Sequence, residues 1–297
     1  MPALSLPRTL TVTAWSVCIG TLGLVAALLL DIPAAPLTGP AIAVSIAGLA
    51  GLEVDVDARL RELCFIVLGV GIGGGFNTEA TAAVLRWPLA FVALGAGLYA
   101  TLVICREVMA RFFDFPRRDA ILASAPGHLS FVMSLAADAR ADVGRIAVVQ
   151  SIRLLALTLA VPLVAHLMGF EIDITGFAGG NPMSLPPVVV LGVLGLGLGL
   201  VFRRLKLPAP LLLGAMAVSG GAHLGGAVDG GLPKYLLLPA FMVMGTLIGA
   251  RFSGITPRAL VSALGAGGCV TVVATVIAAA AAMPVAAFLG MPPAAVL

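Results

Sequence analysis

Long apolar runs, separated by short polar or proline-containing stretches, recur along the whole chain. A helix needs about 20 apolar residues to cross a bilayer, and most of these runs are close to that length. The pattern therefore predicts an all-α polytopic membrane protein with about nine spanning helices. The runs lie at about residues 10–30, 37–52, 64–80, 87–112, 146–168, 186–202, 208–226, 235–250 and 259–283.

A tenth segment, residues 120–137, has a different pattern. It contains Pro126, Gly127 and His128 in succession near its start, and Asp138 and Arg140 follow it. Proline and glycine together interrupt a helix. We therefore expect a broken or re-entrant helix at 120–137 instead of a spanning one.

Composition agrees with a membrane protein and disfavours other classes. The chain of 297 residues is 60% hydrophobic and 10% charged, whereas soluble proteins carry about 25% charged residues. Its 17 Lys and Arg residues are dispersed between the apolar runs, without the basic stripe that binds nucleic acid. We therefore expect the lipid bilayer as the main partner and no direct contact with nucleic acid.

The cysteines and histidines do not form a metal-binding pattern. The four cysteines lack Cys-x-x-Cys spacing, which predicts reduced thiols packed as small apolar side chains. A copper or iron oxygenase needs clustered His and carboxylate ligands, but the three histidines are far apart in the chain. We therefore expect no metal, no cofactor and no enzymatic activity. The residues concerned are Cys18, Cys64, Cys105 and Cys269, and His128, His166 and His223.

An internal repeat organises the chain. The pattern Phe65-x-Val67-x-Gly69-x-x-Ile72-Gly73-x-x-Phe76 recurs in the second half, from Phe241 to Phe252. Upstream, the sequence around Pro33 recurs around Pro208. The offset between these two prolines is one residue smaller than the offset between Phe65 and Phe241. We therefore predict two duplicated transmembrane repeats, at 1–170 and 186–297.

We expect the second repeat to be incomplete at its C-terminal end. In the register that relates Phe65 to Phe241, Ile121 corresponds to Leu297, so the counterpart of Ala125-Pro126-Gly127 is absent. Each half of a duplicated transporter normally contributes one interrupted helix. We therefore expect either a natural continuation of roughly 50 residues or an obligate homo-oligomer that covers the same face.

The positions of Lys and Arg predict which side of the membrane each loop occupies. If 120–137 crossed the membrane, each side would carry 8 basic residues, with Arg153 left inside a helix. If 120–137 enters and leaves on one side, that side carries 14, and the other carries only Arg86 and Lys234. Cytoplasmic loops are enriched in Lys and Arg, so the second arrangement is favoured. It places the N-terminus in the cytoplasm and inverts the two repeats, an architecture typical of secondary transporters.

The interrupted segment also carries the candidate chemistry. Backbone groups freed by Pro126 and Gly127 are tolerated at membrane depth only where protein or a watery cavity satisfies them. Arg153 lies about 12 Å deeper along its helix than Arg145 at 1.5 Å per residue, and Gln150 shares its face. The candidate substrate-binding residues are Ser124, Pro126, Gly127, His128, Ser130, Gln150 and Arg153.

Structural roles for the same residues stay open at this point. The turn also fits a kink packed against neighbouring helices, and Arg153 also fits a side chain that extends to the membrane interface. Glu107, Asp138 and Asp142 are candidate counter-ions for Arg153. The charged run at 53–62 is expected to be a loop in water.

Three motifs stand close together in this region. They are the stretch from Arg118 to Ser130, Ala-Asp-Val at 141–143 and Gln-x-x-Arg at 150–153. They resemble motifs of the AbrB family of bacterial membrane proteins, often labelled "putative ammonia monooxygenase". Two positions depart from the family pattern, because His128 replaces a second glycine and Phe131 replaces a usual acidic residue. The resemblance implies a role in regulating gene expression and kinship to inverted-repeat transporters.

We therefore expect a multi-pass protein of the bacterial inner membrane, similar to secondary transporters, that carries an unidentified small polar solute. The alternative is a membrane-embedded regulatory protein that affects gene expression without transport. A metal-dependent monooxygenase is disfavoured by the dispersed histidines.

Cysteine labelling tests the predicted topology in a background without native cysteines. Arg140→Cys should be shielded from an impermeant reagent added outside, because the interrupted segment returns to the cytoplasmic side. Ile174→Cys should react with the same reagent. Reaction of both from outside would mean that 120–137 crosses the membrane and that the repeats are parallel.

Overall fold

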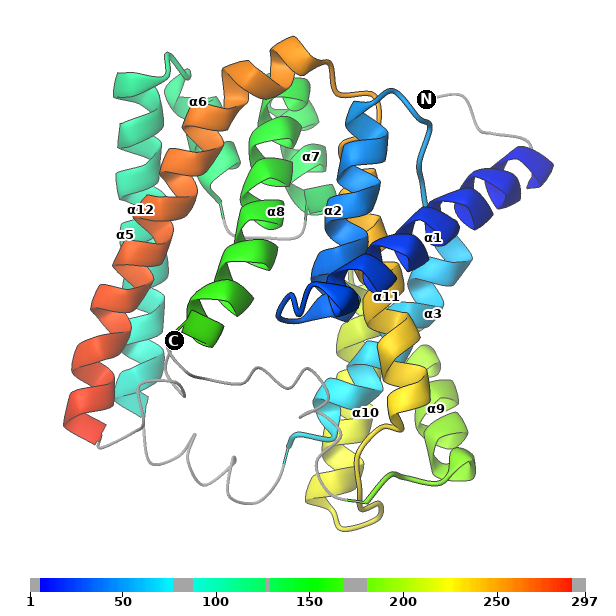
Figure 1. Cartoon of the computed structure of the whole chain (residues 1–297). Coiled ribbons are helices and arrows are strands. Elements are labelled where there is room, and N and C mark those ends of the chain that lie inside the picture. Colours follow the sequence, from blue (N-terminus) through cyan, green and yellow to red (C-terminus); the bar gives the residue numbers. More distant parts are fainter. Residues whose placement is uncertain (1–5, 77–87, 126–128, 168–180, 290–297) are drawn as a thin grey trace. The chain divides into compact units, whose positions relative to one another are not determined.

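The structure is a computed structural model that describes residues 6–76, 88–125, 129–167 and 181–289. These residues form eleven α-helices and no strand (Figure 1). Contacts divide the chain into two compact units, and each unit draws on both halves of the sequence. Unit 1 comprises 1–83 and 171–254, and unit 2 comprises 84–170 and 255–297.

Each of the nine apolar runs corresponds to one helix, and the tenth segment is divided between two helices. Unit 1 contains α1 (Leu6–Leu29), α2 (Ala35–Leu49), α3 (Ala58–Gly73), α9 (Leu185–Arg204), α10 (Pro210–Leu224) and α11 (Lys234–Ala250). Unit 2 contains α5 (Pro88–Phe112), α6 (Arg117–Ser124), α7 (Leu129–Asp138), α8 (Val143–Leu167) and α12 (Pro257–Leu289).

Five of the described helices are long and apolar enough to cross a membrane, fewer than the nine expected. The helices α2, α10 and α11 are apolar but have only 15, 15 and 17 residues. Helices of that length span about 22–26 Å at 1.5 Å per residue, whereas the hydrocarbon core is about 30 Å thick. The five candidate spans are Arg8–Leu29, Val92–Phe112, Val143–Leu167, Leu185–Arg204 and Pro257–Ala281.

The start of α3 corrects the prediction of a loop at 53–62. Asp57 caps the helix, and its carboxylate accepts the backbone N–H of Arg59 at 2.9 Å. Such a cap satisfies one of the N–H groups that a helix start leaves unpaired. The charged residues Arg61 and Glu62 therefore lie in the first turns of α3, because the helix extends beyond its apolar part.

The connections within unit 1 recur with the same backbone geometry. In each half, a residue with positive φ follows the first helix and an alanine with positive φ precedes the second. A left-handed alanine costs about 1 kcal/mol or more, so its occurrence twice in one register marks the same turn built twice. The pairs, all in the register that relates Pro33 to Pro208, are Asp31 and Lys206 (48° and 57°), Ala34 and Ala209 (55° and 44°), and Gly51 and Gly226 (93° and 66°).

Two close helix contacts of unit 1 join one half of the chain to the other. The Gly245-x-x-x-Gly249 step of α11 packs on α2, where a Cβ on its second glycine would lie 2.8 Å from the carbonyl oxygen of Ala41. The pair Gly69 and Gly73 of α3 packs on α10 in the same way, and a Cβ on Gly73 would lie 2.7 Å from the carbonyl oxygen of Met216. Glycines spaced four apart let two backbones approach closely in a membrane, and no larger side chain fits here.

The order of these contacts gives the direction of each helix. Residues that come later on one helix touch residues that come later on the other, so α2 runs parallel to α11 and α10 runs parallel to α3. The contacting pairs are Gly245 with Leu37, Gly249 with Ala41, Gly69 with Leu212, and Gly73 with Met216.

The helices α3 and α11 run in opposite directions. A Cβ on Gly71, near the end of α3, would lie 3.4 Å from Leu232 and 3.5 Å from Leu237, at the start of α11. Beyond the other ends of these helices, the N–H of Val54 donates to the hydroxyl of Ser253 at 3.3 Å. It follows that α2 is antiparallel to α10, its counterpart in the second half (Figure 1).

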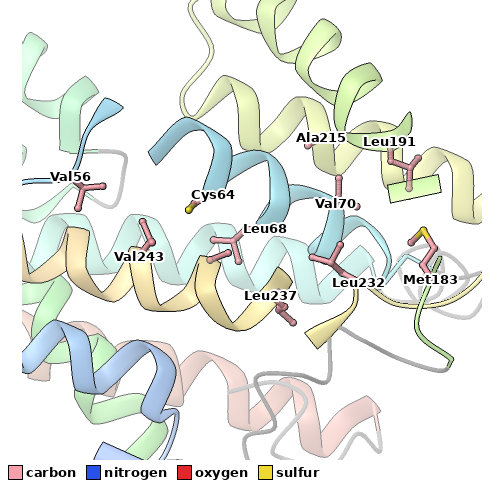
Figure 2. Packing of buried hydrophobic residues seen from close by; sticks show 11 residues of the cluster. Val56, Cys64, Leu68, Val70, Met183, Leu191, Ala215, Leu232, Leu237 and Val243 are labelled. Carbon is pink, nitrogen blue, oxygen red and sulfur yellow. The ribbon is translucent and has the colours of Figure 1, made fainter. Parts of the chain in front are cut away.

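Apolar side chains fill the space around the crossing of α3, α10 and α11. Leu68 from α3 and Val243 from α11 lie side by side, and Leu191 reaches the cluster from α9 (Figure 2). Leu232 and Leu237 are each only 1% exposed. The buried members are Val56, Cys64, Leu68, Val70, Met183, Leu191, Ala215, Leu232, Leu237, Ala240 and Val243.

Alanine substitutions test the glycine contacts. Gly249→Ala should lower the melting temperature in detergent, because overpacking costs about 1–3 kcal/mol and exceeds the gain in helix propensity of about 1 kcal/mol. Gly221→Ala on α10 is the matched control, since its Cβ meets nothing within 4 Å. The control should melt at or above the wild-type temperature. Equal melting of the two variants would contradict the close contact of α11 with α2.

Candidate functional site

The segment 120–137 is broken, as predicted. The helix α6 ends at Ser124, and Ala125 adopts φ −59° and ψ 124°, which lies outside the helical region. Residues before proline are driven out of that region by the proline ring. Pro126, Gly127 and His128 of the predicted site lie outside the described residues.

The outer ends of α6 and α7 lie next to each other. The Arg118 side chain, in the first turn of α6, donates to the carbonyl oxygen of Ala139, just after α7, at 3.0 Å. The Asp119 carboxylate accepts the N–H of Asp142 at 3.2 Å. The chain therefore enters and leaves at the same end of unit 2 (Figure 1). We call residues 117–138 the α6–α7 hairpin.

The helix α8 supplies donors for the carbonyl groups that α6 leaves free at its C-terminus. Nε2 of Gln150 donates to the carbonyl oxygens of Leu122 at 3.0 Å and Ala125 at 3.1 Å. The guanidinium of Arg153 donates to those of Ser124 at 2.9 Å and Ala125 at 3.3 Å. The last carbonyls of a helix have no partner within the helix, and leaving one unsatisfied in apolar surroundings costs several kcal/mol. Gln150 and Arg153 therefore stabilise the break.

The structure brings together three of the predicted site residues, Ser124, Gln150 and Arg153. Ser124 is 0% exposed, and its hydroxyl donates to the sulfur of Met109 on α5 at 3.4 Å. The hydroxyl of Ser124 thus faces the protein, and only its carbonyl contacts Arg153. Ser130 belongs to α7, and its side chain lies outside the described part of the chain.

Two of the predicted counter-ions of Arg153, Glu107 and Asp142, bond to other groups among the described residues. Glu107 pairs with Arg111 at 2.9 Å. Asp142 caps α8 by accepting a backbone N–H of its first turn at 3.0 Å, and Asp138 is exposed at the end of α7. The carbonyl dipoles at the C-terminus of α6 carry partial negative charge and face the Arg153 guanidinium instead.

Arg145 has a related role that the sequence did not predict. Its guanidinium donates to the carbonyl oxygens of Phe113 at 2.7 Å and Asp114 at 3.2 Å, just after α5. The same group lies 3.7 Å from the centre of the Phe115 ring, a cation–π contact. Arg145, Gln150 and Arg153 together make α8 the donor helix of unit 2. The acceptors are backbone carbonyls, which have no signature in the sequence.

The four cysteines lie on four different helices of the described chain. All four cysteines are free thiols. Cys105 is buried on α5, and its sulfur lies 3.7 Å from the carbonyl oxygen of Val270 on α12. Within the described ranges, no three His, Cys, Asp or Glu residues group together to hold a metal ion.

Gln150→Leu tests the capping of α6. The variant leaves the carbonyl oxygen of Leu122 without its side-chain donor, and an unsatisfied buried acceptor costs about 1–3 kcal/mol. Thr158→Val on the same helix is the control, because Thr158 bonds only within its own turn, to Leu154 at 2.8 Å. Thermal unfolding in detergent should show a lower melting temperature for Gln150→Leu alone. A wild-type melting temperature for Gln150→Leu would contradict the capping role.

Comparisons with known proteins agree with the motifs around the hairpin. A protein of Escherichia coli (strain K12) named "Putative regulator AbrB" is 26% identical over 230 residues, which cover 76% of this chain and 65% of that protein. The "Uncharacterized protein YhjN" of Bacillus subtilis (strain 168) is 26% identical over 189 residues, which cover 59% of this chain and 48% of that protein. This chain thus spans less than two thirds of either relative. No solved structure matches it. Residues 36–297 match the family described as transition state regulatory protein AbrB, and the chain belongs to this AbrB family.

Proposed function

We propose that this chain is a secondary-transporter-like protein of the bacterial inner membrane that carries a small polar solute. The α6–α7 hairpin is the observation that carries the proposal. Interrupted helices form the substrate sites of many secondary transporters. Irregular backbone at membrane depth is tolerated only where protein buries it or where it lines a watery cavity. Here the guanidinium of Arg153 and the side-chain amide of Gln150, both on α8, donate to carbonyl oxygens at the end of α6.

The relation between the two halves supports the same proposal. In unit 1 the matching helices run in opposite directions, and they are joined by turns whose positive φ angles recur in one register of the repeat. Inverted repeats of this kind let a transporter expose one site to either side of the membrane in turn. We infer two inverted repeats, at 1–170 and 186–297, whose helices are exchanged between the two compact units.

Contacts within unit 1 support the proposed sidedness. Two ion pairs join segments that the positions of Lys and Arg place in the cytoplasm. Arg8 pairs with Glu53 at 2.8 Å, and Arg203 pairs with Glu62 at 3.7 Å. We therefore propose a cytoplasmic N-terminus.

The solute would bind at the inner end of the α6–α7 hairpin. A guanidinium has five N–H donors, more than the two that Arg153 uses for the carbonyls of Ser124 and Ala125. Arg153 can therefore hold the broken helix and still donate to oxygen atoms of a solute. The proposed binding residues remain Ser124, Pro126, Gly127, His128, Ser130, Gln150 and Arg153. Such a site needs no cofactor and no chemical step, so we propose that the chain is not an enzyme.

A regulatory role is the alternative from another class. The family description and the name of the Escherichia coli relative refer to regulation. In that case the α6–α7 hairpin would respond to a ligand or a partner protein without net movement of solute, and gene expression would change indirectly.

Reconstitution into proteoliposomes separates the two functions. Transport predicts uptake of at least one member of a panel of small organic anions, cations and zwitterions. Arg153→Met should abolish that uptake, because both the charge and the carbonyl donors are lost, whereas Arg153→Lys should retain part of it. Thr158→Val serves as the folded control with wild-type uptake. Absence of flux for every solute, together with specific capture of a partner protein, would contradict transport and favour regulation.

A further inference from the structure

Two arginines, Arg61 and Arg251, lie near each other at one end of the helix pair α3 and α11. The two helices are antiparallel, so Arg61 near the start of α3 meets Arg251, which directly follows α11. Further along the pair, Leu68 from α3 and Val243 from α11 share the apolar cluster (Figure 2). Burial, and then the nearby positive charge of Arg61, lower the pKa of the Arg251 guanidinium. Arginine nevertheless stays protonated in proteins, so two positive charges stand side by side.

The internal repeat indicates that packing alone does not require these two cations. In the register that relates the glycine pair of α3 to that of α11, Arg61 corresponds to Leu237. Leu237 is 1% exposed, so an apolar side chain is buried at the corresponding place. In the same register Arg251 corresponds to Gly75, which has no side chain. The opposite end of this helix pair is therefore built without charge.

The two guanidiniums lack partners among the described residues. Neither forms an ion pair with a carboxylate there, and Nε of Arg251 is buried without a hydrogen-bond partner. Buried polar groups nearly always have a partner, and adjacent like charges repel. The carboxylates nearby in the chain bond to other groups: Glu53 to Arg8 at 2.8 Å, Glu62 to Arg203 at 3.7 Å, Asp57 to the N–H of Arg59 at 2.9 Å, and Asp55 to the N–H of Val56 at 2.8 Å.

We propose that Arg61 and Arg251 together bind a phosphate group at this end of unit 1. A guanidinium presents a planar fork of N–H groups that matches the oxygen atoms of a phosphate. An anion between the two guanidiniums would offset their mutual repulsion, which no described carboxylate does. The start of a helix also favours negative charge, and α3 begins at this end.

The proposed orientation of the chain places this site on the cytoplasmic side, because the ion pair of Arg8 with Glu53 belongs to the same end of unit 1. Two sources of phosphate are available there. One is the headgroup of an anionic lipid in the cytoplasmic leaflet, and the other is a soluble phosphate compound. The site itself does not depend on whether the chain transports a solute.

Thermal unfolding of the full chain tests the proposal in two arms. In a neutral detergent, inorganic phosphate is compared with chloride at matched ionic strength. In nanodiscs, phosphatidylcholine alone is compared with an equal mixture of phosphatidylcholine and phosphatidylglycerol. We expect a higher melting temperature in at least one arm, because a ligand that binds only the folded chain stabilises it. A rise in detergent identifies soluble phosphate as a ligand, and a rise confined to the mixed nanodiscs identifies the lipid headgroup.

Substitutions assign the rise to the two arginines. Arg251→Gln should weaken binding about tenfold or more, the effect of one charge-assisted hydrogen bond, and so remove most of the rise. Arg61→Gln should do the same, which keeps the test decisive where one variant fails to fold. Arg204→Gln is the matched control, because it removes the same charge from an exposed side chain at the end of α9, and it should keep the full rise. No rise in either arm would overturn the proposal, and so would a full rise in Arg61→Gln and Arg251→Gln.

Discussion

A main-chain polar group inside an apolar environment must have a hydrogen-bond partner, and this constraint accounts for most of the features around the interrupted helix. Since α6 ends at Ser124, the carbonyl groups of its last turn have no helical partners. Gln150 and Arg153 on α8 donate to these carbonyls. The break is therefore stable only when α8 lies beside it. The cost of an unpaired carbonyl, several kcal/mol in hydrocarbon, is a large fraction of the stability of a typical domain, about 5–15 kcal/mol.

The same environment removes the hydrophobic force that normally joins helices, because lipid tails are as apolar as leucine side chains. Close backbone contact replaces it in unit 1, where the glycine step of α11 meets α2 and that of α3 meets α10. Each of these contacts joins the two halves of the chain, so neither half could form unit 1 alone. A bundle with inverted halves, in a chain that also contains an interrupted helix, is the arrangement on which the proposed transport rests.

Much of this fold could be predicted from the sequence, because apolar runs, prolines and repeated glycines are local signals. Each apolar run became a helix, and Pro126 marked the break in 120–137. The start of α3 was missed because hydropathy detects only its apolar part, although Asp57 is a recognisable cap. The role of Arg145 could not be predicted, since its acceptors are backbone carbonyls of another segment. Helix length also limited the prediction, because hydropathy does not distinguish a short buried helix from a spanning one.

The central claim is that the chain contains a hairpin broken at Ala125 and held by α8, and a bundle whose halves are inverted. An experimental structure in lipid nanodiscs, at a resolution that shows carbonyl oxygens, measures this most directly. We expect α6 and α7 to enter the bilayer from the same side, with Gln150 and Arg153 within hydrogen-bonding distance of the last carbonyls of α6, and α2 antiparallel to α10. A continuous helix through residues 117–138 that crosses the bilayer, or α2 and α10 running in the same direction, would contradict it.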